Sequence, residues 1–276
     1  MRVRADPVVV AGAVLTLALV ATAALAPAIA PYDPRALGPP LAPPSGAHLL
    51  GTNDIGQDIA SQVVWGARSA VTVSLGAALV AVVLGVAVGL GSALVGGAAD
   101  TVAMRVLDVF LAVPQLPLLV LVAALAGPRQ ANLVVVIGLL RWPDIARQVR
   151  SQARSLRQRG WVSAARGFGG GLGHVARHHL LPALGPVVVT LAVTTVAQTL
   201  LVEAGLAFLG LADPTAVSWG LMVNRALRFP GIFFIDAWRW WLLPPGLAIS
   251  LGVLGFMLLG VGLEPYANPR WRRRSP

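Results

Sequence analysis

The chain has 276 residues, 57% of them hydrophobic, and a mean hydropathy of +0.77. This composition excludes an ordinary soluble domain and indicates a membrane protein with several spans. Cysteine is absent, which excludes a disulfide framework. The net charge of +10 comes entirely from arginine, and a chain without lysine has no phosphate-binding P-loop. If ATP drives this protein, the ATPase is therefore a separate subunit.

The first predicted element is a membrane span over residues 8–30, which is uncharged and long enough to cross a bilayer. Asp6 and Pro7 suit an N-cap and the first helical position. A signal peptide is the alternative, because residues 28–30 (AIA) look like a cleavage site, but the apolar run is longer than signal peptides use. We expect an uncleaved N-terminal helix, residues 1–30, with a cytoplasmic N-terminus.

Residues 31–66 are predicted to form an extracytoplasmic segment, irregular at first because it is rich in proline and glycine. Near its end, residues 48–58 read HLLGTNDIGQD. Asp54 and Asp58 lie four residues apart, a spacing that a metal pair could use. The favoured interpretation is that they are turn and cap residues that position the next span.

A five-helix core is predicted over residues 67–264. Its spans are expected at residues 69–99, 101–126, 132–149, 180–202 and 244–263. Small residues let helix backbones approach closely in lipid, so the glycine-rich span 69–99 should face other helices. Its glycines are Gly76, Gly85, Gly89 and Gly91.

Charged residues accompany two of these spans. Arg105 and Asp108 are three residues apart near the start of span 101–126 and can pair on one helical face. Residues 132–140 alone are too short to cross a bilayer, so the next span must continue through Arg141 and Asp144. Such charges are tolerated when they face the bundle or an aqueous cavity.

The segment 150–180 is basic and broken by glycines, so we expect it in water between two spans. Small residues from Ser163 lead to glycines 169–171, and helical spacing resumes at Leu172. Two short helices around a glycine bend would form a knob that fits a groove on another protein. An ordinary solvated loop is the alternative. A metalloenzyme site at His174, His178 and His179 is disfavoured because no carboxylate is close in sequence.

The remaining parts are an extracytoplasmic insertion over residues 205–241 and a basic cytoplasmic tail over residues 265–276. Tryptophans in the insertion suit the level of the lipid headgroups. With six spans and both termini inside, 15 of the 21 arginines fall on the cytoplasmic side and 6 outside. This excess has the sign that the positive-inside rule requires.

Three motifs resemble those of permease subunits of ABC importers in the dipeptide, oligopeptide and nickel class. The segment 161–182 is similar to their EAA loop, with Ala164, Ala165, Gly169, Leu181 and Pro182 at matching positions. Ser163 stands where glutamate is expected, and His179 where an aliphatic residue is. Residues 48–58 resemble the HxLGTDxxGRD signature, and residues 203–220 resemble EAALSFLGLG…PSWG.

The resemblance implies an all-α membrane protein with the type I ABC-importer permease fold and no catalysis of its own. It also implies three sets of site residues. The residues that would couple to the ATPase are Ser163, Ala164, Ala165, Arg166, Phe168, Gly169, Leu172, Leu181 and Pro182. The translocation or gating candidates are Asp108, Pro114 and Glu203. The extracytoplasmic signature comprises Gly51, Thr52, Asp54, Gly56, Asp58, Ser218, Trp219 and Gly220.

The implied partners are a second homologous permease, two ATP-binding subunits, an extracytoplasmic substrate-binding protein and the bilayer of the bacterial inner membrane. No metal site and no nucleic-acid partner are expected. ATP and Mg²⁺ would bind in the partner ATPases, so this chain should carry no cofactor. The alternative is a secondary transporter or channel driven by an ion gradient. It is disfavoured because acids within the spans are few and no internal repeat is evident.

Overall fold

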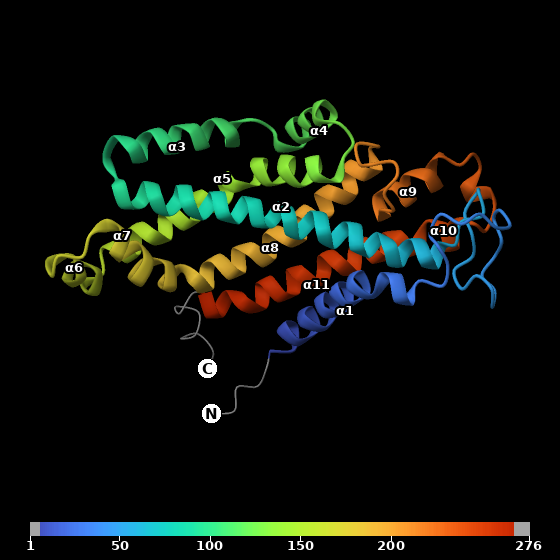
Figure 1. The fold of residues 1–276 in the computed structure, drawn as a ribbon, viewed down its shortest axis with the longest axis horizontal. Helices are drawn as coiled ribbons and strands as arrows, with labels where there is room; N and C mark the ends of the chain where they lie inside the picture. The colour runs from blue at the N-terminus through green and yellow to red at the C-terminus, as the bar shows by residue number, and fades with distance from the viewer. Residues whose placement is uncertain (1–5, 268–276) are drawn as a thin grey trace.

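The structure is a computed structural model that describes residues 6–267, and this part of the chain is helical throughout its core (Figure 1). Within residues 6–267, a π-helical turn (η1) and a 3₁₀ turn (η2) accompany eleven α-helices. In chain order the elements are α1 (Pro7–Ile29), α2 (Ile59–Val95), α3 (Gly97–Ala112), α4 (Gln115–Ala126), α5 (Gln130–Arg157), α6 (Gly160–Gly167), α7 (Leu172–Val175), η1 (Ala176–Leu180), α8 (Leu181–Phe208), α9 (Trp219–Arg228), η2 (Ile232–Phe234), α10 (Trp238–Trp241) and α11 (Leu243–Ala267).

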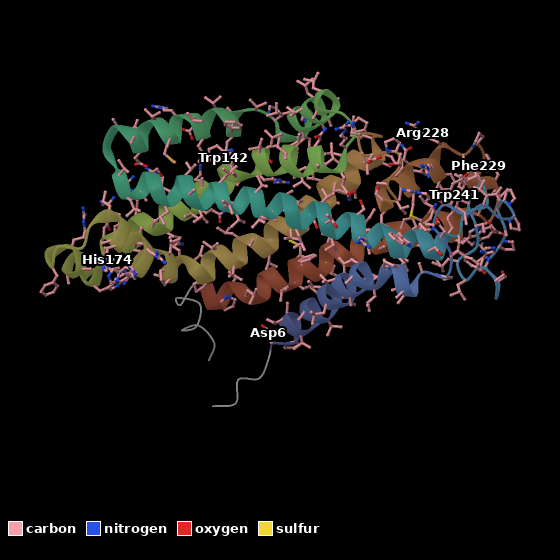
Figure 2. All side chains as sticks on the ribbon, viewed as in Figure 1. Asp6, Trp142, His174, Arg228, Phe229 and Trp241 are labelled. Carbon is pink, nitrogen blue, oxygen red and sulfur yellow. The ribbon has the colours of Figure 1, made fainter. Side chains whose placement is uncertain are left out.

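The long helices lie roughly side by side in an elongated bundle, with α2 in contact with both α5 and α8 (Figure 1). The short helices α6 and α7 form one end of the bundle. At the opposite end lie α9, α10 and the irregular segment that joins α1 to α2. Figure 2 places His174 at the first end and Trp241 at the second. The two ends therefore carry the two non-spanning regions that the sequence predicts.

Helix α1 confirms the predicted first helix, and the Asp6 side chain caps it by accepting from Val8 N at 3.0 Å. It packs along α11 at very short range. A Cβ at Gly12 would lie 2.4 Å from Leu259 N, and one at Gly262 would lie 2.4 Å from Val9 Cγ2. Such glycine contacts give close helix packing in lipid. α1 is thus an integrated helix of the bundle, as expected of a span and not of a signal peptide.

Helix α2 begins at Ile59, ten residues before the predicted start of its span, so residues 59–66 of the predicted irregular segment are helical. The first turns contain Gln62, Trp65 and Arg68, which lower the local hydropathy without ending the helix. Asp58 stops the helix from extending further back, because its side chain caps the first turn. The span is one continuous helix of 37 residues.

The predicted third span, residues 101–126, is not one straight helix. It is divided into α3 and α4, which meet at an angle of 89°. Val113 lies at the break in an extended conformation, followed by Pro114. A proline disfavours the helical conformation of the residue before it, which accounts for the position of the bend.

Helix α5 runs unbroken from Gln130 to Arg157, so the predicted helix does continue through its charged residues, whereas its crossing of the membrane stays a prediction. It packs tightly against α2 through glycines. A Cβ at Gly85 would lie 2.6 Å from Ile145 Cβ, and one at Gly89 would lie 2.5 Å from Ala146 O. Gly76 likewise faces Val134, whereas Gly91 meets no atom within 4 Å. The prediction of a helix-facing glycine stripe therefore holds for three of its four members.

Four helices of the described residues are long and apolar enough to cross a membrane. They are Pro7–Ile29, Ile59–Val95, Leu172–Phe208 and Trp238–Pro265, and the bent pair of α3 and α4 meets the same criterion when taken together. α5 is not among them because arginines 141, 147, 150, 154 and 157 accompany Asp144 along it. The predicted basic tail at residues 270–274 lies outside the described residues.

Candidate functional site

The predicted knob forms as two short helices, α6 and α7, around a glycine bend, and we call residues 160–175 the α6–α7 knob. Gly169 has a positive φ of 89°, a conformation that L residues with side chains rarely adopt. Gly170 N donates to Ala165 O at 3.0 Å, and this bond ties the bend back onto α6. The prediction that glycines end the first helix is confirmed.

The knob is anchored to the bundle by buried apolar side chains and exposes an aromatic side chain. Val162 and Val175 are buried in a cluster with residues of α5 and α8, including Val149 and Leu184. Phe168, by contrast, is 92% exposed and stands at the tip. The knob therefore presents an exposed aromatic side chain to its surroundings.

The other coupling candidates lie in the knob or at the start of α8. Ser163, Ala164, Arg166, Leu172, Leu181 and Pro182 are exposed, whereas Ala165 is half-buried. The knob joins α8 through η1, in which Arg177, His178 and His179 project. The rings of His174 and His178 stack with centroids 4.6 Å apart. Among the described residues no group of three metal-ligating side chains is placed to hold a metal ion, so the histidine cluster gives no support to a metalloenzyme.

The signature in residues 48–58 folds as a compact turn at the opposite end of the bundle. Thr52 is fully buried, and its hydroxyl donates to Pro39 O at 2.6 Å and accepts from Ala42 N at 2.8 Å. Gly51 and Gly56 have positive φ angles of 71° and 81°. A Cβ at Gly56 would lie 1.9 Å from Gly38 O. These contacts pack residues 51–56 against residues 38–42 of the same loop.

Asp58 is the helix cap that the sequence predicts. Its carboxylate accepts from Ser61 N at 2.8 Å and lies 3.0 Å from His48 Nδ1. Asp54 is exposed in the turn and is not part of that network. The two acids therefore serve as turn and cap residues, and the metal-pair alternative has no support.

The Ser218-Trp219-Gly220 motif fastens α9 to the long helices. Ser218 caps α9 by accepting from Leu221 N at 3.3 Å, and Trp219 Nε1 donates to Val63 O of α2 at 2.8 Å. The indole lies against Gly66, where a Cβ would come within 2.4 Å of Trp219 Cδ1. A Cβ at Gly220 would lie 2.1 Å from Ala204 O of α8. Both contacts depend on the absence of a side chain.

The three gating candidates occupy different environments. Asp108 forms an ion pair with Arg147 of α5 at 2.7 Å, so the predicted pairing with Arg105 is wrong. Helix packing brings Arg147 close from 39 residues away. Pro114 marks the break between α3 and α4. Glu203 is 1% exposed within α8, so in this subunit by itself it faces the helix packing and not an open path.

Two polar contacts escaped the sequence analysis. Arg150 of α5 binds Asp100 of α3 through two bonds of 2.5 and 2.6 Å, a bidentate pair that joins these helices. Arg35 donates to Thr215 O at 2.6 Å and thereby joins the α1–α2 segment to the loop between α8 and α9. The sequence signals the first contact only by an acidic residue, Asp100, at a helix junction. It does not identify the partner, Arg150, which lies 50 residues away.

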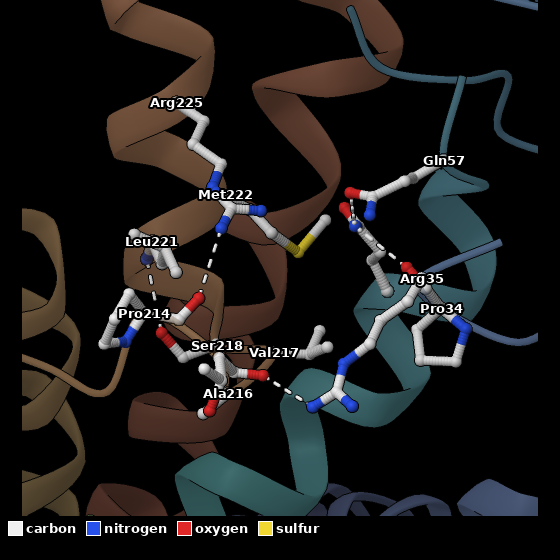
Figure 3. A pocket seen from close by; sticks show the side chains of 12 residues that line it. Pro34, Arg35, Gln57, Pro214, Ala216, Val217, Ser218, Leu221, Met222 and Arg225 are labelled. Carbon is white, nitrogen blue, oxygen red and sulfur yellow. Dashed lines mark hydrogen bonds between the residues drawn. The ribbon is translucent and has the colours of Figure 1, made fainter. Parts of the chain in front are cut away.

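A cavity of about 380 Å³ with polar and apolar lining opens beside the Arg35 bridge (Figure 3). Residues 34–35, 57 and 62 line one side, and residues 214–218, 221, 222 and 225 line the other. Gln62 donates to Gln57 Oε1 at 2.7 Å in its wall. Nearby, hydrogen bonds from the side chain and backbone of Thr215 hold the pKa of Asp213 below its usual value. This end of the bundle is therefore hollowed, with both polar and apolar side chains in the wall of the cavity.

The chain is similar to known proteins over most of its length. Residues 81–273 match the family described as binding-protein-dependent transport system inner membrane component. A protein of Brucella suis biovar 1 (strain 1330) whose name describes a peptide permease is 38% identical over 82% of this chain and 74% of its own.

Two Escherichia coli (strain K12) proteins are also similar. The "Probable D,D-dipeptide transport system permease protein" is 33% identical over 97% of this chain and 89% of its own. The "Nickel transport system permease protein" is 35% identical over 87% of this chain and 86% of its own.

Proposed function

The chain belongs to the family of binding-protein-dependent transport system inner membrane components and is an inner-membrane permease subunit of an ABC transporter. From this premise we propose that it forms one half of a translocation path for a small solute and catalyses no reaction itself. In this proposal a second permease supplies the other half, two ATP-binding subunits drive the cycle, and an extracytoplasmic protein delivers the solute. Peptides and nickel or metal chelates are the proposed solutes, because relatives carry peptide and nickel names.

The observation that carries the coupling role is the α6–α7 knob. It combines a rigid base, formed by buried Val162 and Val175, with an exposed tip at Phe168 and small residues at Ser163 and Ala164. Small side chains permit close approach of an ATPase, and the buried base transmits the resulting displacement to α5 and α8. Ser163 replaces the glutamate of the EAA pattern, so docking here rests on shape and apolar contact.

The proposed topology has six crossings with both termini in the cytoplasm. In it, α3 and α4 form one bent crossing, and α5 is a polar crossing whose charges face other helices or water. The α6–α7 knob is then cytoplasmic, and the polar end with α9 and α10 is extracytoplasmic. The distribution of arginine supports this orientation.

Two single-cysteine variants test this orientation, because the natural chain contains no cysteine. Phe234→Cys and Phe168→Cys replace side chains that are 94% and 92% exposed, at opposite ends of the bundle. In intact cells an impermeant thiol reagent should label the cysteine at 234 and leave the one at 168 unlabelled until lysis. The reverse pattern would invert the topology, and labelling of both in intact cells would exclude it.

The proposed function is tested by affinity purification of the tagged chain from its native membrane. An ATP-binding protein and a second permease should co-purify, and the preparation should hydrolyse ATP. The chain purified alone should hydrolyse none, because it has no lysine for a P-loop. Solute uptake that continues without ATP and stops when the ion gradient is dissipated would instead establish a secondary transporter.

A further inference from the structure

We infer that Arg141 of α5, together with Gln198 of α8, is a contact point for a carboxylate group of the transported solute. This inference rests on the proposed function and names a specificity determinant within it. Arg141 lies eleven residues into α5, about 16 Å along the helix from its first residue, which is half the thickness of a bilayer. Its neighbour Trp142 lies between the two ends of the bundle in Figure 2.

The guanidinium of Arg141 is incompletely satisfied by the described residues. Its Nη1 donates to Gln198 Oε1 at 3.4 Å, a long contact. Its Nε is buried and has no hydrogen-bond partner within the described part of the chain. An unpaired arginine at mid-bilayer is costly, and such residues mark substrate or ion pathways. The side chain therefore has donors left for another acceptor.

Arg141 and Gln198 continue a polar seam that runs between α5, α8 and α11. Going toward the knob, Gln148 and Gln152 follow at helical spacing from Arg141. Thr194 and Thr190 follow in the same way from Gln198 along the antiparallel helix α8. These four residues and Glu264 of α11 line a cavity of about 320 Å³. The seam thus extends from mid-bilayer toward the cytoplasmic end.

Contact with lipid is a poor explanation for this seam. Gln148, Gln152, Gln198 and Glu264 are all exposed on the isolated subunit. Gln198, at the depth of Arg141, would lack partners in hydrocarbon, so it must face water or another protein. A solute path along the boundary with the second permease supplies both water and a neighbouring protein surface.

The charge pattern of the seam favours an anionic group at Arg141. Asp144 lies one turn further along α5 and accepts a hydrogen bond from Gln115 Nε2 at 3.2 Å. Arg141 belongs to none of the ion pairs of the described residues. The other acid, Glu264, lines the cavity farther along the seam. A planar guanidinium with free donors matches a carboxylate in two parallel bonds. Peptides and many metal chelates carry such a group.

The cysteine-free chain allows a direct test in membranes that hold the whole importer. Thr194→Cys places a small thiol in the seam, one turn from Gln198. Anionic and cationic methanethiosulfonate reagents of equal size serve as probes. With Arg141 present, the ratio of anionic to cationic labelling rates should exceed the ratio with Arg141→Gln by about five-fold, as expected for a charge within about 10 Å in a partly aqueous site.

Three results would overturn the inference. The first is an unchanged ratio in the Arg141→Gln background. The second is a thiol at 194 that reacts with neither reagent. The control Leu17→Cys, at a lipid-facing position of α1 that is 67% exposed, should show this lack of reaction. Loss of ATPase co-purification in Arg141→Gln would likewise overturn it, by making Arg141 an assembly residue. Failure of the proposed function is separate, because it requires that no ATPase co-purifies with the unaltered chain.

Discussion

Ala164→Trp is expected to lower solute uptake by about five-fold or more while leaving membrane insertion and pairing with the second permease intact. The Ala164 methyl is exposed on α6, so a larger side chain there is tolerated by the subunit itself. Against a docked ATPase it would overpack a close interface, at a cost of about 1–3 kcal/mol, which corresponds to a loss of affinity of roughly 5- to 150-fold. ATPase co-purification should fall with uptake. The neighbouring Ala165 is half-buried, so a tryptophan there would also strain the knob.

Gly169→Val should have a comparable effect through the backbone. Nothing lies within 4 Å of a Cβ at Gly169, so crowding is excluded and the cost comes from its positive φ, which β-branched residues resist. Gly169→Asn should be milder, because asparagine tolerates this conformation. Gly171→Val, at a φ of −67° and also in open space, is the matched control.

Uptake and ATPase co-purification at matched expression measure these variants. Ser155→Trp adds the same bulk to an exposed position of α5 outside the knob and should change neither quantity by more than about two-fold. Wild-type uptake by both Ala164→Trp and Gly169→Val would remove the coupling role from the knob. An equal loss in Ser155→Trp would show that bulk anywhere on this surface is harmful and would contradict a local docking site.

Gly220→Ala is expected to destabilise the subunit by about 3 kcal/mol, seen as a fall on the order of 10 °C in the midpoint of thermal unfolding in detergent. The added methyl would lie 2.1 Å from Ala204 O and 2.8 Å from Ala207 Cβ, so α9 must move away from α8. That movement also pulls Trp219 from its bond to Val63 O.

Gly205→Ala is the control for Gly220→Ala. Gly205 is on α8, one residue from the clashing carbonyl, and a Cβ there meets no atom within 4 Å. Alanine also has the higher helix propensity, so this change should leave the midpoint unchanged or raise it slightly. Equal midpoints for the two variants would show that α9 does not depend on the close contact at Gly220.

The arrangement of the helices along the chain was largely determined by the sequence. Uninterrupted apolar runs predicted α1, α8 and α11, since a long apolar segment has few stable alternatives to a membrane helix. The glycine bend of the knob and the Asp58 cap were also local effects, because a positive φ and a free N–H group select particular residue types over a few positions. The early start of α2 was missed because Gln62 and Arg68 reduce hydropathy without ending a helix.

The polar contacts between helices required the tertiary structure. Asp108 is paired with Arg147, Asp100 with Arg150, and Arg141 reaches Gln198, across 39 to 57 residues. Spacing along one helix offered Arg105 as the nearer partner for Asp108, yet the packing of α3 against α5 decided otherwise. The same holds for Trp219, whose partner Val63 lies 156 residues away. Sequence patterns constrain one helix at a time, whereas which faces of two helices meet depends on the packing of all of them at once.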